Sequence, residues 1–267
     1  METISRPHFT TFMEVVRLET NDPKEAAELV HPVLAHTKVV RIEPLWHITD
    51  LRSFYDELSA QLGHVLDIAE DFAQGGTQTG ERWMEIRYDD DVPDMKAYRH
   101  SKNGQPLHTD ESYVDDPADI MVFYCVNKAT AGGETNYVDV FELIELLRSI
   151  DPALLEELTT VPLTYKKSEL RRCRKIIDLE GKNGPSVNYN YYCIDPEASE
   201  KERQLNQRFF DFLELHVRGS YIEHPVALRP SEGVLWWDHF VLHGRRPFHA
   251  RKTDDRLIWK TGLKWLA

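Results

Sequence analysis

The sequence predicts a mainly β protein in which flanking helices surround a barrel or jelly roll of strands. Short apolar runs rich in β-branched and aromatic residues, such as residues 119–129, are bounded by glycine and proline turns. The predicted strands neither alternate with long helices nor form βαβ units, which argues against a doubly wound parallel sheet. A chain of 267 residues is long for one domain, but a single β sandwich or barrel can reach this size.

The N-terminal third mixes helices and strands. Residues 22–37 are predicted to form a helix, because Asp22 can cap it and Pro23 suits its first position. Residues 49–65 are predicted to form a second helix with one apolar stripe. Strands are predicted at residues 38–45 and 81–88, and a loop at residues 89–106.

The rest of the chain carries most of the predicted strands. Residues 119–129 and 134–140 are predicted strands on either side of an Ala-Gly-Gly turn. The other predicted elements are short helices at 141–150 and 152–160, a broken hairpin at 168–194, an amphipathic helix at 197–217, a strand–turn–strand unit at 224–248 and a last strand at 255–266. We therefore expect one domain, with α/β decoration over about residues 1–90 and a jelly-roll core with a helical insert over about residues 81–267.

Composition narrows the class of protein. The formal net charge of −13 argues against a general nucleic-acid binder and against docking on anionic lipid. Three widely spaced cysteines form no disulfide framework, and the N-terminus lacks the apolar stretch of a signal peptide, so we expect a reducing, cytoplasmic location. No apolar run approaches the roughly 18 residues of a membrane span.

Five residues form a candidate site. His108 and Asp110 stand two apart in LHTDESY, so an extended backbone would point both to one side. Alone, such a pair is more often a hydrogen-bonded pair at the surface or core edge. His243, in WWDHFVLHGRRPF, lies near the end of a predicted strand, and Arg256 lies on the next strand, in DRLIWK. Thr135 follows the glycine turn in GGETNYVDV.

These residue types together indicate one chemistry. Two neutral imidazoles and one carboxylate on one face of a metal leave the other face open, which suits non-haem Fe(II) handling O₂ and a chelating co-substrate. An arginine nearby suits a dicarboxylate, because its planar fork grips a carboxylate with two hydrogen bonds, and a threonine hydroxyl can add another. Each part has an ordinary structural explanation, but the set in this order does not share one.

The motifs LHTDESY, GGETNYVDV, WWDHFVLHGRRPF and DRLIWK resemble the TauD/TfdA family of Fe(II)- and 2-oxoglutarate-dependent dioxygenases, most closely its clavaminate-synthase-like branch. The resemblance covers roughly residues 100–265 and implies a single dioxygenase domain with a double-stranded β-helix (jelly roll, cupin-like) core. It implies that His108, Asp110 and His243 bind iron, and that Arg256 binds the distal carboxylate of 2-oxoglutarate with help from Thr135.

The same resemblance implies the reaction type. 2-Oxoglutarate and O₂ would be consumed, succinate and CO₂ released, and an unactivated C–H bond hydroxylated, with desaturation or cyclisation as variants. Halogenation is not expected, because Asp110 stands where related halogenases have a small residue. Two positions depart from the pattern: Lys260 replaces a second arginine, and Asp238-His239 replaces Asp-Asn, with His239 read as a packing residue.

Several alternatives stay open at this point. A zinc-dependent hydrolase could use the same three ligands, and a non-catalytic jelly-roll module could bind a ligand without turnover. The small-molecule substrate is expected to be an amino acid or an amino-acid-derived biosynthetic intermediate. Glu111, Asp115 and Asp116 could meet a cationic substrate, although solvated loops are the more common case. The sequence leaves open whether Arg245 pairs with a carboxylate or is solvated. Tyr189, Tyr191 and Tyr192 are expected to pack in the core or in a sheet. The sequence does not determine the oligomeric state.

Overall fold

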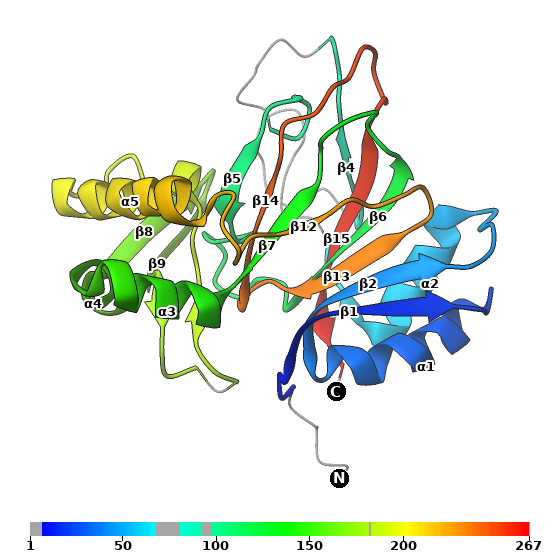
Figure 1. The fold of residues 1–267 in the computed structure, drawn as a ribbon, viewed down its shortest axis with the longest axis horizontal. Helices are drawn as coiled ribbons and strands as arrows, with labels where there is room; N and C mark the ends of the chain where they lie inside the picture. The colour runs from blue at the N-terminus through cyan, green and yellow to red at the C-terminus, as the bar shows by residue number, and fades with distance from the viewer. Residues whose placement is uncertain (1–6, 68–80, 92–97, 182, 267) are drawn as a thin grey trace.

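The computed structural model describes residues 7–67, 81–91, 98–181 and 183–266. Within these ranges the chain is a mixed α/β protein with several mostly antiparallel sheets (Figure 1). The largest sheet runs in the order β1-β2-β13-β6-β15-β3, with β4 also paired to β15. Its strands are β1 (Thr11–Leu18), β2 (Thr37–Pro44), β3 (Gly63–Val65), β4 (Met84–Arg87), β6 (Ile120–Asn127), β13 (Gly233–Trp237) and β15 (Leu257–Trp265).

The N-terminal segment extends this large sheet. β1 and β2 are parallel and are joined by α1 (Pro23–Leu34), and β2 then pairs antiparallel with β13. The Asp22 side chain caps α1 by accepting from the backbone N–H groups of Lys24 and Glu25. α2 (Leu51–Leu62) buries its apolar stripe and ends where β3 begins. β1, α1 and β2 therefore form a βαβ unit, and the expectation that the chain has none was wrong here.

A smaller sheet carries most of the candidate site. Its order is β12-β7-β14-β5, and its strands are β5 (Gln105–His108), β7 (Thr135–Asp139), β12 (His224–Val226) and β14 (Val241–Arg245). Alternate residues face two different cores, as the period of a strand requires. On β14, Val241 belongs to the core shared with the large sheet, whereas Leu242 belongs to a second core.

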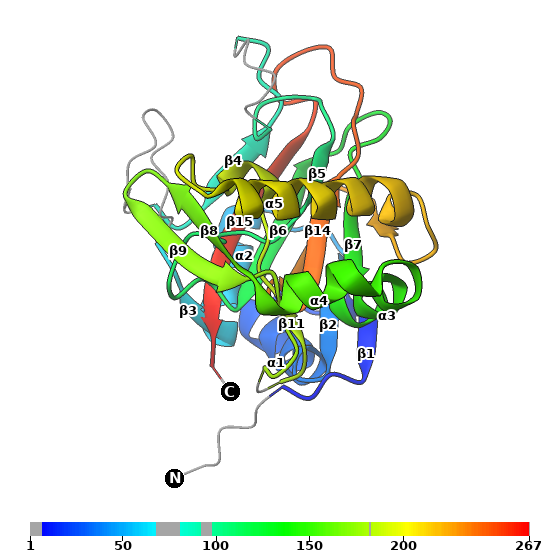
Figure 2. The same cartoon turned by 90° about the vertical axis from the view of Figure 1, so that its left-hand side faces the viewer.

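The second core lies under an insert that covers the outer face of the small sheet (Figure 2). The insert contains α3 (Val140–Ile150), α4 (Pro152–Thr160), α5 (Glu200–Phe212) with a π-helical turn (Leu213–Val217), a 3₁₀ turn (Tyr191–Cys193), the hairpin β8 (Pro162–Lys167) and β9 (Leu170–Lys175), and the short pair β10 (Ile177–Asp178) and β11 (Ser186–Val187). α5 begins with a reciprocal capping box between Ser199 and Glu202. None of the helices in the described part of the chain is long and apolar enough to cross a membrane.

Most predicted elements are confirmed, with shifted ends. The predicted helix at 49–65 stops at Leu62, because residues 63–65 pair with β15 instead. The predicted loop at 89–106 loses its last two residues to β5, while residues 92–97 lie outside the described residues. The strand–turn–strand unit at 224–248 contains three strands, since the chain turns at Asp238 and His239 between β13 and β14. β1 and β8 were not predicted.

Candidate metal centre and its cavities

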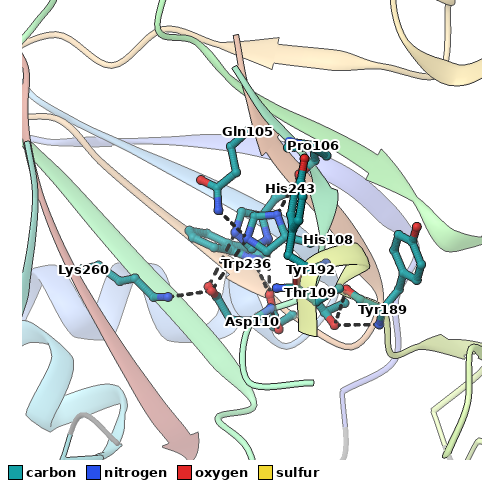
Figure 3. A network of polar contacts seen from close by, with 12 residues as sticks. Gln105, Pro106, His108, Thr109, Asp110, Tyr189, Tyr192, Trp236, His243 and Lys260 are labelled. Carbon is teal, nitrogen blue, oxygen red and sulfur yellow. Dashed lines mark hydrogen bonds and ion pairs between the residues drawn. The ribbon is translucent and has the colours of Figure 1, made fainter. Parts of the chain in front are cut away.

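Strand pairing brings the two histidines together. β14 pairs with β5 so that His243 lies opposite His108, and their ring centroids are 4.2 Å apart (Figure 3). Both side chains face the core between the two sheets, because Leu107 and Leu242 beside them face the insert. Asp110 follows in the turn after β5 and completes a cluster of three potential ligands.

The spacing of the three side chains fits one metal ion. The Nε2 atom of His243 lies 3.5 Å from Asp110 Oδ2, and that of His108 lies 3.9 Å from Asp110 Oδ1. One ligand atom from each residue falls within 4.8 Å of the others. Ligands at roughly 2.0–2.2 Å from an ion leave comparable gaps between them. Asp110 Oδ2 is buried and makes no hydrogen bond with the described residues, so an ion would satisfy it.

The protonation states also favour a metal. Burial lowers the pKa of His108 and of His243 to about 4, so both imidazoles are neutral near pH 7. Burial opposes the charge of Asp110, but the adjacent Lys260 ammonium favours that charge, and the pKa of Asp110 lies below its usual value. Two neutral imidazoles and an ionised carboxylate are the forms that bind a divalent ion.

Hydrogen bonds orient the ligand atoms of the first histidine. The Pro106 carbonyl lies 2.8 Å from His108 Nδ1, and a carbonyl can only accept, so Nδ1 donates and the Nε2 lone pair faces the cluster. Gln105 Nε2 lies 3.1 Å from His108 Nε2 and donates to its lone pair.

Asp238 supports the other two members of the cluster. Its Oδ2 accepts from the Asp110 backbone N–H at 2.8 Å, and its Oδ1 lies 3.5 Å from His243 Nδ1 and accepts from Trp236 Nε1. Burial and the nearby Asp110 charge raise the pKa of Asp238 well above its usual value. The sequence offered one signal for this residue, its place in the segment before His243, but not its contacts.

Arg256 and Thr135 join the three clustered residues around one small cavity. Its walls are Ile86, Gln105, His108, Asp110, Phe123, Thr135, His243, Gly244, Arg245, Arg256 and Lys260. Burial lowers the pKa of Arg256 to about 10, so its guanidinium stays charged near pH 7. Arg256 Nη2 donates to the Gly133 carbonyl at 3.3 Å, whereas the buried Nη1 makes no hydrogen bond with the described residues. A carboxylate in this cavity would satisfy Nη1.

The glycine turn before Thr135 has a steric reason. Gly133 has a φ of +80°, which side chains rarely adopt, and an added Cβ would come within 3.1 Å of Arg256 Nε. Phe248 lies beside the same arginine and beside Arg245, with guanidinium-to-ring distances of 5.4 and 5.2 Å. The turn and Phe248 therefore hold Arg256 in place.

Arg245 is a structural residue rather than a solvated one. It is buried, and its Nη2 donates to the carbonyls of Tyr98, Ser101 and Asn103. Burial lowers its pKa to about 9. It ties the segment before β5 to β14, which places His108 beside its partner strand.

Lys260 contacts the carboxylate of the cluster directly. Its Nζ lies 2.6 Å from Asp110 Oδ1, and both side chains are mostly buried (Figure 3). This contact leaves Oδ2 as the oxygen that faces His243. Lys260 therefore has a defined place at the site, which the sequence left undecided.

A larger cavity of about 590 Å³ shares His108 and Asp110 with the small cavity. Tyr191 and Tyr192 line it. Tyr189 is buried in the insert core and Tyr191 packs against that core, so the expected packing role is confirmed for these two, whereas Tyr192 is exposed. Glu111 also lines it, but its carboxylate accepts from the Ala118 backbone N–H. The remaining walls are formed by Met84, Ile86, Tyr98, Arg99, His100, Gln105, Pro106, Leu107, Tyr113, Lys166, Lys167, Asn190, Cys193 and Lys260.

Comparisons with known proteins identify the family of this chain. The model of the family described as taurine catabolism dioxygenase TauD, TfdA family matches residues 12–261. The gamma-butyrobetaine dioxygenases of Homo sapiens and Pongo abelii are each 20% identical over 170 residues, which is 60% of this chain and 44% of the relative. The chain thus spans less than half the length of the curated relatives it matches.

Solved structures with a similar fold include three oxygenase-related proteins. PvcB from Pseudomonas aeruginosa has a TM-score of 0.67 at 16% identity, covering 97% of this chain and 87% of that one. Asparagine oxygenase, in complex with Fe(II), 3-hydroxyasparagine and succinate, has a TM-score of 0.64 at 13% identity, and the match covers 94% of this chain and 93% of that one. The non-haem iron oxygenase OrfP, in complex with Fe and alpha-ketoglutaric acid, has a TM-score of 0.62 at 14% identity, and the match covers 90% of this chain and 78% of that one.

The family match runs through all five candidate residues, and the fold neighbours agree with the clavaminate-synthase-like pattern that the motifs resemble. The described structure adds a cluster of two histidines and an aspartate beside a buried arginine. This chain therefore belongs to the TauD/TfdA family of Fe(II)- and 2-oxoglutarate-dependent dioxygenases.

Proposed function

We propose that this chain is an oxygenase that oxidises an unactivated C–H bond of a small molecule and converts 2-oxoglutarate and O₂ to succinate and CO₂. The supporting observation is the small cavity, whose walls include the three potential ligands together with Thr135 and Arg256. We further propose that residues 1–267 work as one domain, and that the large and small sheets form the two walls of a double-stranded β-helix.

Each residue has a role in this proposal. His108, Asp110 and His243 would hold Fe(II), which supplies the oxidising chemistry when bound. Arg256 would bind the distal carboxylate of 2-oxoglutarate through its fork, and Thr135 would add a hydroxyl hydrogen bond. Asp238 would help to position His243, because its Oδ1 lies 3.5 Å from the buried Nδ1 atom, which makes no hydrogen bond within the described structure.

The alternatives explain less of the same geometry. A zinc hydrolase needs the three ligands and a base, but it leaves the buried arginine in the same cavity without a purpose. A binding module without turnover would not require neutral imidazoles beside an ionised carboxylate. Succinate release that requires both Fe(II) and 2-oxoglutarate separates the oxygenase from both.

An amino acid or an amino-acid-derived intermediate is our proposed substrate class. It is supported by similarity in fold to asparagine oxygenase and to an OrfP variant solved with (3S)-hydroxy-L-Arg. The test is a screen for succinate release with Fe(II), ascorbate and a panel of amino acids and pathway intermediates. If none of these compounds stimulated succinate release, although basal release occurred without them, the proposed substrate class would be wrong and the proposed oxygenase reaction would still stand.

We expect no chlorinated product. Asp110 lies within the ligand cluster, so a halide has no coordination position of its own. The measurement is a product mass spectrum in saturating chloride, using a substrate found in the screen. Addition of oxygen or loss of two hydrogens agrees with the proposal, and a chlorinated product from the unaltered protein contradicts it.

Replacing Lys260 with methionine should destabilise the metal-free protein more than the metal-bound protein. Without the ammonium, the buried Asp110 carboxylate loses its partner, and the metal-free protein should lose about 3 kcal/mol of stability. A divalent ion replaces that lost charge, so Mn(II) should raise the melting temperature more in the variant than in the unaltered protein. Thermal unfolding with and without Mn(II) measures both effects.

Lys264→Met is the matched control for this prediction. Lys264 lies four residues further along β15 and pairs with the exposed Asp116 instead of a potential ligand. Removing the Lys264 ammonium should change the Mn(II)-dependent rise in melting temperature little. A smaller rise in Lys260→Met than in the unaltered protein would show that Lys260 assists the ion rather than competing with it for Asp110.

A further inference from the structure

A second small cavity, here called the side pocket, is lined by Asp110 of the ligand cluster and has a volume of about 30 Å³. It shares five walls with the 590 Å³ cavity, namely Met84, Asp110, Glu111, Tyr113 and Lys260. Its other walls are Leu66, Asp67, Met121, Thr261 and Gly262. A cavity of about 10–15 Å³ can hold one water molecule, so the side pocket has room for one small polar group, such as an ammonium.

Acidic side chains outnumber basic ones in the walls of the side pocket. The described walls hold Asp67, Asp110 and Glu111 against one cation, Lys260, whose Nζ lies 2.6 Å from Asp110 Oδ1. Asp67 is exposed and lies 4.0 Å from the Arg82 guanidinium, so Glu111 is the more enclosed of the two acids that are not potential ligands. With Asp110 bound to a metal ion, Asp67 and Glu111 would still outnumber Lys260. The charge of the pocket therefore favours a cationic group.

The two oxygens of the Glu111 carboxylate have different surroundings. Oε2 accepts from the Ala118 backbone N–H at 3.0 Å. Oε1 makes no hydrogen bond or ion pair within the described structure, and it is still accessible to solvent. An ionised carboxylate can accept several hydrogen bonds, so one oxygen fixes the side chain while the other can accept from a ligand in the cavities that Glu111 lines.

The turn that carries Glu111 is held in a conformation that few side chains adopt. Glu111 has a φ of +53°, and its carbonyl accepts from the Val114 backbone N–H at 2.8 Å. An added Cβ at Gly262 would come within 2.8 Å of Ala118 Cβ, so this glycine lets the end of the turn pack closely against β15. Such conformations cost free energy and cluster at sites that need a preset geometry. The Glu111 carboxylate is therefore positioned before any ligand binds.

The other charged walls of the large cavity lie outside the side pocket. Arg99, Lys166 and Lys167 line the large cavity but are not walls of the side pocket. Asp115 and Asp116, which could have met a cationic substrate, line neither cavity. The preference for a cation thus belongs to the side pocket and to Glu111 rather than to the large cavity as a whole.

We infer that the prime substrate, the molecule that is oxidised, carries a protonated amine and that Glu111 Oε1 binds this ammonium in the side pocket. The amine would lie on the part of the substrate nearest the metal, because Glu111 follows the potential ligand Asp110 and both line this pocket. The inference rests on the proposed function and narrows its substrate class. An amino compound should bind, whereas the analogue with a hydroxyl in place of the amine should bind weakly.

A pair of fluorescent probes tests the inference without knowledge of the substrate. Dansylcadaverine ends in a primary ammonium, and 5-(dansylamino)pentan-1-ol has a hydroxyl in its place. Both are titrated, with fluorescence anisotropy as the readout, into the protein loaded with Mn(II) and saturating 2-oxoglutarate. We expect the ammonium probe to bind at least about ten-fold more tightly than the hydroxyl probe, and less tightly as salt is added.

Two charge-neutralising variants of the same segment assign the effect. Glu111→Gln should weaken binding of the ammonium probe about ten-fold or more, while binding of the hydroxyl probe changes less than about two-fold. The glutamine amide oxygen can still accept from the Ala118 N–H, so the turn should persist, and the circular dichroism spectrum and melting temperature check this. Asp115→Asn removes an exposed carboxylate that lines neither cavity and should change the binding of neither probe.

Three results would overturn the inference. They are equal affinities of the unaltered protein for the two probes, no binding of the ammonium probe, and an effect of Asp115→Asn as large as that of Glu111→Gln. The first two are measured on the unaltered protein, so they hold even if a variant fails to fold.

The outcome stays separate from that of the proposed function. Succinate release without a prime substrate is measured on the unaltered protein with Fe(II), 2-oxoglutarate and O₂, and probe binding does not depend on turnover. Succinate release with no preference for the ammonium probe would support the oxygenase and reject the ammonium site. A preference for the ammonium probe that Glu111→Gln removes, without succinate release, would support the site and reject the oxygenase.

Discussion

His243→Ala should lose substrate-dependent succinate release by at least about a thousand-fold, which corresponds to about 4 kcal/mol. The variant would keep two of the three proposed ligands, and its alanine methyl group would offer no replacement for the Nε2 atom that lies 3.5 Å from Asp110. The fold should survive, because β14 is held by backbone pairing to both β5 and β7. Mn(II) binding by calorimetry and the circular dichroism spectrum measure the two effects separately.

His239→Ala is the matched control, since it lies four residues earlier on the same segment. Its pKa is also lowered to about 4, by burial and by the charges of Arg174 and Arg172, but it lies in neither cavity wall. Its removal should leave Mn(II) binding and succinate release within about two-fold. Loss of metal binding in His239→Ala with retention in His243→Ala would move the distal ligand to His239.

Arg256→Gln should raise the concentration of 2-oxoglutarate needed for half-maximal turnover by at least about a hundred-fold. Removing the charged partner of a buried carboxylate typically costs about 2–5 kcal/mol, and about 2.7 kcal/mol corresponds to this factor. Arg256 is suited to the role because it is buried and charged, and its Nη1 makes no hydrogen bond within the described structure. Mn(II) affinity without 2-oxoglutarate should change little, since Arg256 is not part of the ligand cluster.

Two further variants sharpen the assignment of this arginine. Arg256→Lys keeps the charge without the planar fork and should recover only part of the affinity. Arg251→Gln changes an exposed arginine five residues earlier, outside the small cavity, and should leave the dependence on 2-oxoglutarate unchanged. If instead Arg251→Gln weakened the dependence and Arg256→Gln did not, Arg251 would take the role.

The missed elements have identifiable physical causes. β1 has the sequence TFMEVVRL with a mostly half-buried pattern, and only its parallel pairing with β2 distinguishes it from an irregular segment before α1. β8 was missed because PLTYKK follows a helix directly and ends in two lysines, which are depleted in strands. Gly63–Val65 was assigned to a helix because its β pairing depends on β15, about 200 residues later.

Sequence alone determined the residue types at the site and their order along the chain. His108 with Asp110, Thr135 after a glycine turn, His243 and Arg256 were named from motif and spacing, because metal and carboxylate chemistry restricts each position to a few side chains. Local sequence also determined where these helices begin, because the caps at Asp22 and Ser199 depend on neighbours within three residues.

Tertiary structure alone decided what surrounds these residues. The contact of Lys260 with Asp110 joins residues 150 positions apart, and that of Asp238 with Asp110 spans 128. Lys166 and Lys167, at the end of β8, line the large cavity because the insert packs on the face of the small sheet opposite His243, and no local pattern encodes that choice of face. Motif spacing reports the chemistry of a ligand set, whereas the charge and shape of a cavity arise from segments that meet only after folding.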